Sequence, residues 1–195
     1  MTPKDILKIT LNLVIIYVVG GFILAGVYSQ TSPIIFRNAV LEKEAALKKL
    51  IPEADRIDKL GDWTIHEKHA EYFIAKKDDK PVGYIIQSFG KGYSSYINTL
   101  IAVDTDFTIR NISILGQAET PGLGDGIETD DFKNQFRGKD IDHLSVVKTG
   151  SDGYIEALSG ATITTRAVAE DAVKNSLVFL TEKIKDEKGE DGGDR

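Results

Sequence analysis

Two short loops carry the residue types that could bind a ligand. The first, LSGATITT at residues 158–165, places hydroxyl side chains beside Gly160 and Ala161, where a strand is expected to give way to a helix. Such hydroxyls often do no more than cap the free N–H groups of a helix start. The same N–H groups and the positive end of the helix dipole can also seat a phosphate. The residue types therefore leave capping and phosphate binding both open.

The second loop, QAETPGLGDG at residues 117–126, contains three glycines and one proline after an expected strand. This composition is typical of a surface turn, but a loop held on a rigid scaffold also offers backbone donors to a ligand. Glu119 and Asp125 could form a carboxylate pair for acid–base work. On a glycine-rich loop we expect these two side chains instead to be solvated or to cap backbone groups.

The rest of the chain offers little further chemistry. The sequence has no cysteine and only one methionine, so thiolate-held iron–sulfur clusters, cysteine zinc sites and covalently attached haem are excluded. We expect His66, His69 and His143 at surface or edge positions, with His66 and His69 on opposite faces of one strand. We therefore predict no metal site and no catalytic residue, and a redox role would need an organic cofactor.

The N-terminus predicts a membrane anchor. Residues 9–28 hold no charged side chain over 20 positions, which makes a helix of about 30 Å, enough to cross the hydrocarbon core of a bilayer. A cleaved signal peptide is the alternative, although its apolar region is usually shorter. Lys4 and Lys8 precede the span, so the positive-inside tendency places Met1 in the cytoplasm and the domain on the outer face of the inner (cytoplasmic) membrane. Residues 1–30 are assigned to this single-pass anchor.

The segments after the anchor change from helical to strand-like periodicity. Residues 31–61 predict a juxtamembrane helix, with apolar positions at helical spacing up to Pro52, followed by a linker. From Trp63 the pattern shortens to strand-like runs such as WTIHEK and EYFIAKK, separated by turn residues such as those at 78–81. This alternation favours an antiparallel meander.

The second half of the domain adds helices to the predicted sheet. A short helix is expected at 129–136, a strand at 144–148 and a long helix after Gly160. The apolar positions of that long helix are Val173, Leu177, Leu180 and Ile184. The fold class is therefore α+β, with an antiparallel-sheet domain at 62–185 that ends in a long helix, and the charged, glycine-rich tail at 186–195 is expected to be disordered.

The charge balance excludes one class of partner. The chain has 24 basic and 30 acidic side chains, a formal charge of −6. A protein that binds the phosphate backbone of nucleic acid needs clustered Lys and Arg, so we expect no nucleic-acid partner.

The two loops give the chain a resemblance to a known family. The SGAT motif at 159–162 followed by Ile163-Thr164, and the ETPGLG run at 119–124, are similar to the signatures of FMN-carrying subunits of ion-translocating membrane oxidoreductases. These are the G subunit of the Rnf complex, the closer match, and the C subunit of the sodium-pumping NADH:quinone reductase. The family usually has Asp three residues before the Ser of this motif, and this chain has Glu156.

The resemblance implies a cofactor and the residues that hold it. In that family a separate flavin transferase links the FMN phosphate to the threonine hydroxyl by a phosphodiester bond, and the matching residue here is Thr162. The second signature lies against the flavin. The implied cofactor-binding residues are Thr162 with Ser159, Gly160, Ala161, Thr164 and Thr165 from the first loop, and Glu119, Thr120, Pro121, Gly122 and Leu123 from the second.

These inferences give a main functional hypothesis and two alternatives. The main hypothesis is that the protein is an FMN-carrying electron-transfer subunit, which relays electrons together with the other membrane and redox subunits of an Rnf-type translocase. We expect no autonomous catalysis, because the flavin reacts and the protein positions it. One alternative is a membrane-anchored domain that senses or binds an anionic ligand without redox function. The other is the flavin domain of an extracellular reductase.

Overall fold

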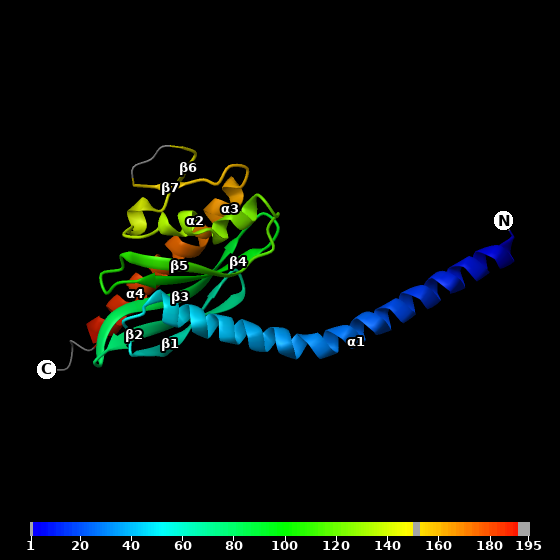
Figure 1. Ribbon diagram of the computed structural model, residues 1–195, viewed down its shortest axis with the longest axis horizontal. Helices are drawn as coiled ribbons and strands as arrows, with labels where there is room; N and C mark the ends of the chain where they lie inside the picture. Colours follow the sequence, from blue (N-terminus) through cyan, green and yellow to red (C-terminus); the bar gives the residue numbers. More distant parts are fainter. Residues whose placement is uncertain (1, 150–152, 191–195) are drawn as a thin grey trace. The chain divides into compact units, whose positions relative to one another are not determined.

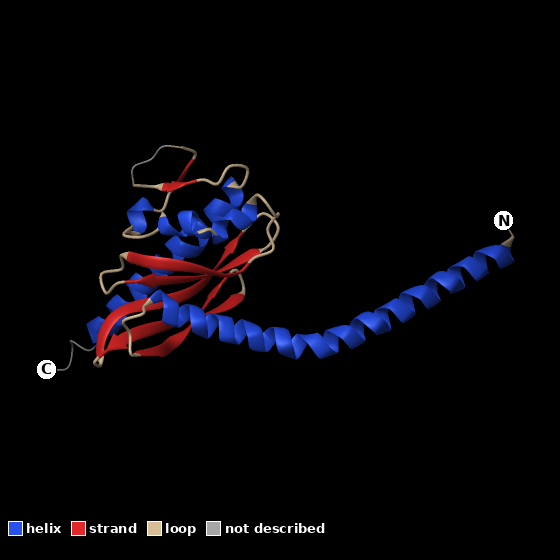
Figure 2. Cartoon of the chain, in the orientation of Figure 1, coloured by secondary structure: helices blue, strands red, loops and turns tan. Residues whose placement is uncertain are grey.

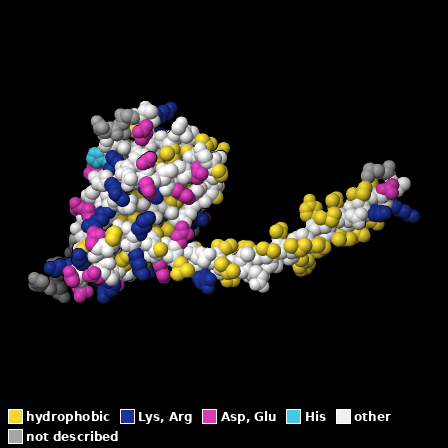
Figure 3. Space-filling view, in the orientation of Figure 1, with side chains coloured by type: hydrophobic (Ala, Val, Ile, Leu, Met, Phe, Trp, Pro, Cys, Tyr) yellow, Lys and Arg dark blue, Asp and Glu magenta, His cyan; other side chains and the backbone are white. Residues whose placement is uncertain are grey.

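The computed structural model describes residues 2–149 and 153–190, which form two units divided between Glu42 and Lys43 (Figure 1). Helix α1 (Pro3–Leu50) makes up the first unit and the beginning of the second. Within these described ranges it is the one helix long and apolar enough to cross a membrane. Its apolar side chains are exposed along the first unit, as the hydrophobic atoms in Figure 3 show. The predicted membrane helix is therefore present.

Helix α1 is longer than the predicted anchor. It continues past residue 30, the predicted end of the anchor, runs through Pro33 and ends only at Leu50. A proline inside a helix costs about 3 kcal/mol, but the following segment 41–49 (LEKEAALKK) is rich in strong helix formers. The predicted juxtamembrane helix in residues 31–61 is thus part of the anchor helix and not a separate element.

The second unit contains a five-stranded antiparallel sheet in the order β1-β2-β3-β4-β5, which confirms the predicted meander (Figure 2). The strands are β1 (Arg56–Ile65), β2 (Lys68–Lys77), β3 (Lys80–Lys91), β4 (Tyr96–Val103) and β5 (Ile109–Gly116). Strand β1 begins at Arg56, inside the segment that we predicted as helix and linker. Charged residues in RIDKLGD hide the strand pattern there, and pairing with β2, from Arg56 opposite Lys76, creates the strand.

Two tight turns connect the first three strands. His66 and Glu67 have φ of 50° and 59°, and Asp78 and Asp79 have φ of 50° and 60°, the left-handed conformations that two-residue hairpin turns require. The predicted turn at 78–81 is confirmed. The predicted strand WTIHEK is instead the end of β1 and a turn, so His66 and His69 do not share a strand, and only His69 lies in β2.

Alternating residues of the sheet build two apolar layers. One face, with Tyr84 and Ile86 of β3, packs against the C-terminal helical segment. The opposite face, with Ile85 and Phe73, is covered by Leu50 and its neighbours at the end of α1. The sheet therefore holds the C-terminal helical segment on one side and the end of α1 on the other.

The predicted long C-terminal helix is present, with an irregular middle. It consists of α3 (Thr162–Arg166), the π-helical segment η3 (Ala167–Lys174) and α4 (Asn175–Glu190). Val173, Leu177, Leu180 and Ile184 are all buried, as predicted. The helix continues to Glu190, so the tail predicted from residue 186 begins too early, because Glu and Lys favour helix; residues 191–195 lie outside the described residues.

The chain between the sheet and this helix forms short elements. They are η1 (Gly124–Glu128), α2 (Asp130–Asn134), η2 (Ile141–His143) and the parallel pair β6 (Val146–Val147) and β7 (Ile155–Glu156). The helix predicted at 129–136 is α2, for which the Thr129 side chain accepts a hydrogen bond from Phe132 N at 3.4 Å. The strand predicted at 144–148 is only two residues long, since its one partner in the described structure is the equally short β7.

Candidate functional site

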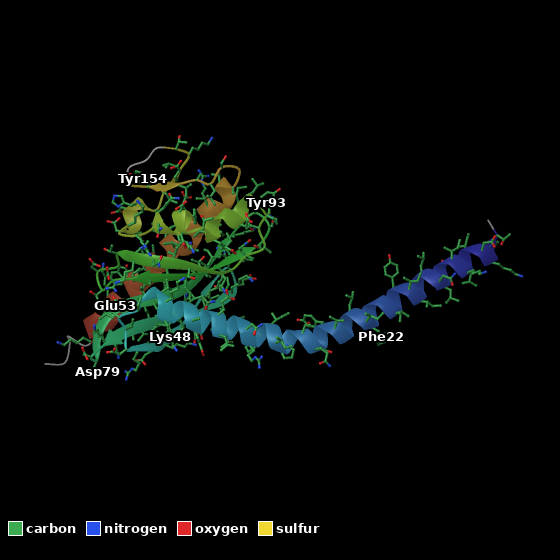
Figure 4. The ribbon with its side chains drawn as sticks, in the orientation of Figure 1. Phe22, Lys48, Glu53, Asp79, Tyr93 and Tyr154 are labelled. Atoms are coloured by element: carbon green, nitrogen blue, oxygen red, sulfur yellow. The ribbon has the colours of Figure 1, made fainter. Side chains whose placement is uncertain are left out.

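The two candidate loops meet at one end of the sheet and enclose a pocket of about 570 Å³. This volume lies in the range of small-molecule and cofactor sites. Three segments line the pocket: the β3–β4 loop, the loop between β5 and η1, and the start of α3. Figure 4 shows Tyr93 at the edge of the domain, where the β3–β4 loop lies close to α3. The lining residues are Tyr93, Glu119, Thr120, Leu123, Gly124, Gly160, Ala161, Thr162, Ile163 and Thr164.

The first loop is held in place by its own hydrogen bonds. Thr165 Oγ1 accepts from Leu158 N at 3.1 Å and donates to Ala161 O at 3.0 Å. Gly160 has φ of +76°, a conformation that a glycine adopts without strain. The capping interpretation therefore holds for Thr165, whose buried hydroxyl ties the loop to the helix.

Thr162 is arranged differently from Thr165. It is the first residue of α3, it is half-buried, and its side chain lines the pocket. The residue before the helix, Ala161, provides no side-chain cap, so the first N–H groups of α3 keep no partner within the helix. Within the described residues the Thr162 hydroxyl has no hydrogen-bond partner. A free hydroxyl beside free N–H groups suits a bound phosphate.

The second loop is shaped by two glycines. Gly122 has φ of +77°. A Cβ atom on Gly124 would stand 2.6 Å from Glu119 Cβ and 3.1 Å from Thr164 Oγ1, so a larger residue would not fit there. The loop closes through hydrogen bonds from Leu123 N and Gly124 N to Thr120 O, at 3.1 and 3.0 Å. This closure brings Thr120 and Leu123 to the pocket.

Glu119 lies at the centre of the site and is only 6% exposed. Its carboxylate accepts hydrogen bonds from Thr164 Oγ1 at 2.7 Å and from the backbone N–H groups of Tyr93, Ser94 and Ser95 at 2.9 to 3.0 Å. Burial alone would raise the pKa of Glu119, but these hydrogen bonds outweigh it and hold the pKa below its ordinary value. We expected Glu119 to be solvated or to cap backbone groups, and the structure confirms the second alternative. Asp125 is half-exposed in η1.

The pocket contains seven of the eleven residues that the sequence indicated. Those seven are Gly160, Ala161, Thr162, Thr164, Glu119, Thr120 and Leu123. The other four do not line it: Ser159, Pro121 and Gly122 are exposed, and Thr165 is buried beneath the loop. The pocket is also lined by Tyr93, Gly124 and Ile163, which were missed. Gly124 and Ile163 lie within the two motifs, whereas Tyr93 follows Gly92 in a loop between two strands, where its backbone N–H donates a hydrogen bond to Glu119.

The three histidines lie away from the pocket, at the surface as predicted. Each is paired with one aspartate: His66 with Asp171, His69 with Asp62 and His143 with Asp140. In the part of the chain that the structure describes, no three His, Asp or Glu side chains form a group that could hold a metal ion.

The lining of the pocket fits a flavin nucleotide. Tyr93, Leu123 and Ile163 are large apolar side chains, 73%, 47% and 56% exposed, around one cavity. Such exposed apolar groups suit a flat aromatic ring. The hydroxyl of Thr162 and the helix start supply the polar end. Apolar walls with a few polar groups at one end are typical of cofactor sites.

Comparisons with known proteins agree with this interpretation. Residues 92–178 match the family described as FMN-binding domain. The chain is 36% identical over 182 residues to the G subunit of the proton-translocating ferredoxin:NAD(+) oxidoreductase complex of Clostridium ljungdahlii, covering 91% of this chain and 93% of that protein. It is 32% identical over 171 residues to the G subunit of the ion-translocating oxidoreductase complex of Escherichia coli, covering 80% and 81%.

A solved structure has the same fold. The crystal structure of Shewanella oneidensis NqrC matches with a TM-score of 0.50 and 25% identity, over 64% of this chain and 66% of that chain. Fold and site thus define an FMN-binding domain that follows a helix long and apolar enough to span a membrane. The chain belongs to the family of G subunits of ion-translocating oxidoreductase complexes, which confirms the family that its two loop motifs indicated.

Proposed function

We propose that this protein is a membrane-anchored flavoprotein that relays electrons within an Rnf-type ion-translocating oxidoreductase complex, with FMN bound covalently to Thr162. The observation that carries the proposal is the half-buried Thr162 hydroxyl, which lines the pocket and has no hydrogen-bond partner within the described residues. A hydroxyl that only capped the helix would be bonded to a backbone group, as that of Thr165 is. The names of the relatives support the complex.

Each wall of the pocket has a separate role in this proposal. Thr162 Oγ1 would lose its proton and bond to the FMN phosphorus, displacing the nucleotide leaving group of an activated flavin donor used by the transferase, and the free N–H groups of α3 would hold the phosphate. Tyr93 and Leu123 would hold the ring and exclude water from one side of it. When bound, FMN supplies the ability to accept and pass on electrons. The protein fixes its position, and no side chain of the pocket needs to act as an acid or a base.

The proposal also includes partners and an orientation. A flavin transferase attaches the FMN, and other membrane and redox subunits donate and accept the electrons. Lys4 and Lys8 on the short side of α1 support a cytoplasmic N-terminus and a flavin domain on the outer face of the cytoplasmic membrane. Covalent attachment suits that location, because a flavin lost there is not easily replaced.

Replacing Thr162 by alanine tests the attachment. The full chain is co-expressed with a flavin transferase, and flavin fluorescence is recorded after denaturing electrophoresis, followed by tryptic mass mapping. We expect the wild-type peptide that contains Thr162 to be heavier by one FMN minus one water, and Thr162→Ala to carry no covalent flavin. Thr64→Ala is the control for the substitution: it removes an exposed threonine hydroxyl of β1 that does not line the pocket, so attachment should persist.

Two results would contradict the proposal in different ways. Covalent flavin in Thr162→Ala, or a modified peptide in which another residue carries the mass, would move the bond elsewhere. A wild-type protein without flavin under these conditions would refute the electron relay and favour a domain that binds an anionic ligand without redox function.

A further inference from the structure

Glu119 joins three segments that lie far apart in the sequence. Its carboxylate binds the β3–β4 loop through Tyr93, Ser94 and Ser95, and it binds α3 through the hydroxyl of Thr164. The carboxylate also accepts from Ser95 Oγ, at 3.2 Å. Glu119 itself belongs to the loop between β5 and η1. All three segments that line the pocket are therefore tied to one side chain.

The backbone around Glu119 is built to make room for this side chain. A Cβ atom on Gly92 would stand 2.5 Å from Glu119 Oε1, and one on Gly124 would stand 2.6 Å from Glu119 Cβ. Contacts shorter than 3.0 Å force a neighbour to move, so both positions accept only glycine while Glu119 stays in place. The side chain thus fixes the distance between Tyr93 on one wall of the pocket and α3 on the other.

The charge of Glu119 has no cation beside it. Its recorded hydrogen-bond donors are backbone amides and hydroxyls, all neutral. Among the ion pairs of the described residues, none involves Glu119; Glu71, by contrast, is paired with both Lys43 and Lys59. Neutral donors stabilise the ionised form without cancelling its charge. A buried negative charge therefore acts on the pocket at reduced dielectric screening.

We propose that Glu119 is the positioning residue of the flavin site: its hydrogen bonds hold the Tyr93 wall against α3, and its uncompensated charge makes reduction of the bound flavin less favourable. This inference rests on the proposed function, because it needs FMN in the pocket. An added electron makes the flavin more negative, and a fixed negative charge nearby opposes that change. The side chain does not have to touch the flavin for either effect.

Three variants separate the charge from the hydrogen bonds. Glu119→Gln removes the charge at nearly constant size and replaces one accepting oxygen by an NH₂ group, so some of the N–H groups of residues 93–95 lose their acceptor. Glu119→Asp keeps the charge on a shorter side chain, so the hydrogen bonds weaken while the charge remains. Glu128→Gln is the control, since it removes an exposed carboxylate of η1 that bonds to Gln117 and does not line the pocket.

The first readout is the midpoint potential of the full-length, flavin-loaded protein in detergent. We expect Glu119→Gln to favour one-electron reduction by about tenfold, a positive shift of about 59 mV. Glu119→Asp should shift the potential by less than a third of that amount, and Glu128→Gln should match the wild type. A shift in Glu119→Asp as large as that in Glu119→Gln, or an unchanged potential in Glu119→Gln, would overturn the role of the charge.

The second readout is amide hydrogen exchange of residues 93–95 in protein expressed without the flavin transferase. We expect exchange at least tenfold faster in Glu119→Gln and Glu119→Asp than in the wild type and in Glu128→Gln. Unchanged exchange in both Glu119 variants would overturn the positioning role. This measurement needs no flavin, so it tests the positioning role of Glu119 even if the wild-type protein binds no flavin. Absence of flavin from the wild type would refute the proposed function and leave the exchange result valid.

Discussion

At Gly90, strand β3 passes directly against the backbone of the C-terminal helical segment. A Cβ atom at this position would stand 1.8 Å from the carbonyl oxygen of Ala167 and 2.6 Å from its carbonyl carbon. Both atoms belong to backbone, so no side-chain rotation can relieve the overlap. We therefore predict that Gly90→Ala pushes η3 away from the sheet and destabilises the domain.

The size of the effect follows from two opposing terms. Overpacking a core costs typically 1–3 kcal/mol, and an overlap with backbone belongs at the upper end of that range. Alanine in a strand regains about 0.5–1 kcal/mol relative to glycine. The net loss is then about 2 kcal/mol, which lowers the melting temperature of a domain of this size by roughly 4–8 °C.

The assay is thermal unfolding of the full chain in detergent, followed by circular dichroism. Gly116→Ala is the matched control, because Gly116 also lies in a strand and a Cβ atom there would meet nothing within 4 Å. We expect the control to be as stable as the wild type or slightly more stable. Equal melting temperatures for Gly90→Ala and Gly116→Ala would refute the packing argument.

Three further predictions concern the loop, acid stability and topology. Gly122→Val should keep covalent FMN but change its absorption spectrum, because valine is strained at the φ of +77°; an unchanged spectrum would separate this loop from the flavin. A hydrogen bond from Lys43 lowers the pKa of Glu71 in the folded protein below its ordinary value of 4.5. The ionised Glu71 therefore stabilises the fold above pH 4.5, and this contribution is lost as the pH falls through the folded-state pKa. In urea titrations the free energy of unfolding should fall less steeply with acid in Glu71→Gln than in the wild type, and equal slopes would contradict this. Protease added to intact spheroplasts should digest the domain after Tyr28; digestion only in inverted vesicles would reverse the orientation.

The sequence predicted those elements whose residues interact mainly with near neighbours in the chain. A predominantly apolar run of 20 residues predicts a membrane-length helix whatever follows it, and Val173, Leu177 and Leu180 repeat at a helical period. The strands from β2 to β5 are runs rich in β-branched and aromatic residues, bounded by turn residues, so the sequence predicts them. The start of β1 could not be read in the same way, because its charged residues become a strand only through pairing with β2.

The parts of the site that the sequence did not predict depend on contacts between residues far apart in the chain. Nothing in the sequence near Tyr93 or Glu119 shows that a carboxylate bonds to backbone groups about 25 positions away. The π-helical segment was also hidden, because the side chains on either side of it keep a helical pattern. Ala167, Val168 and Ala169 are all buried, and such a run of small apolar residues was the one available sign that the helix is enclosed there.

The bonds between Leu158, Ala161 and Thr165 have a consequence for biogenesis. They form only when the start of the helix is in place, and they tie together the residues on either side of Thr162 and its hydroxyl. A transferase that modifies this hydroxyl would then recognise a folded surface rather than a linear peptide. Attachment of the cofactor would follow folding, so unfolded or misassembled copies would remain colourless and the modification would mark correctly folded protein.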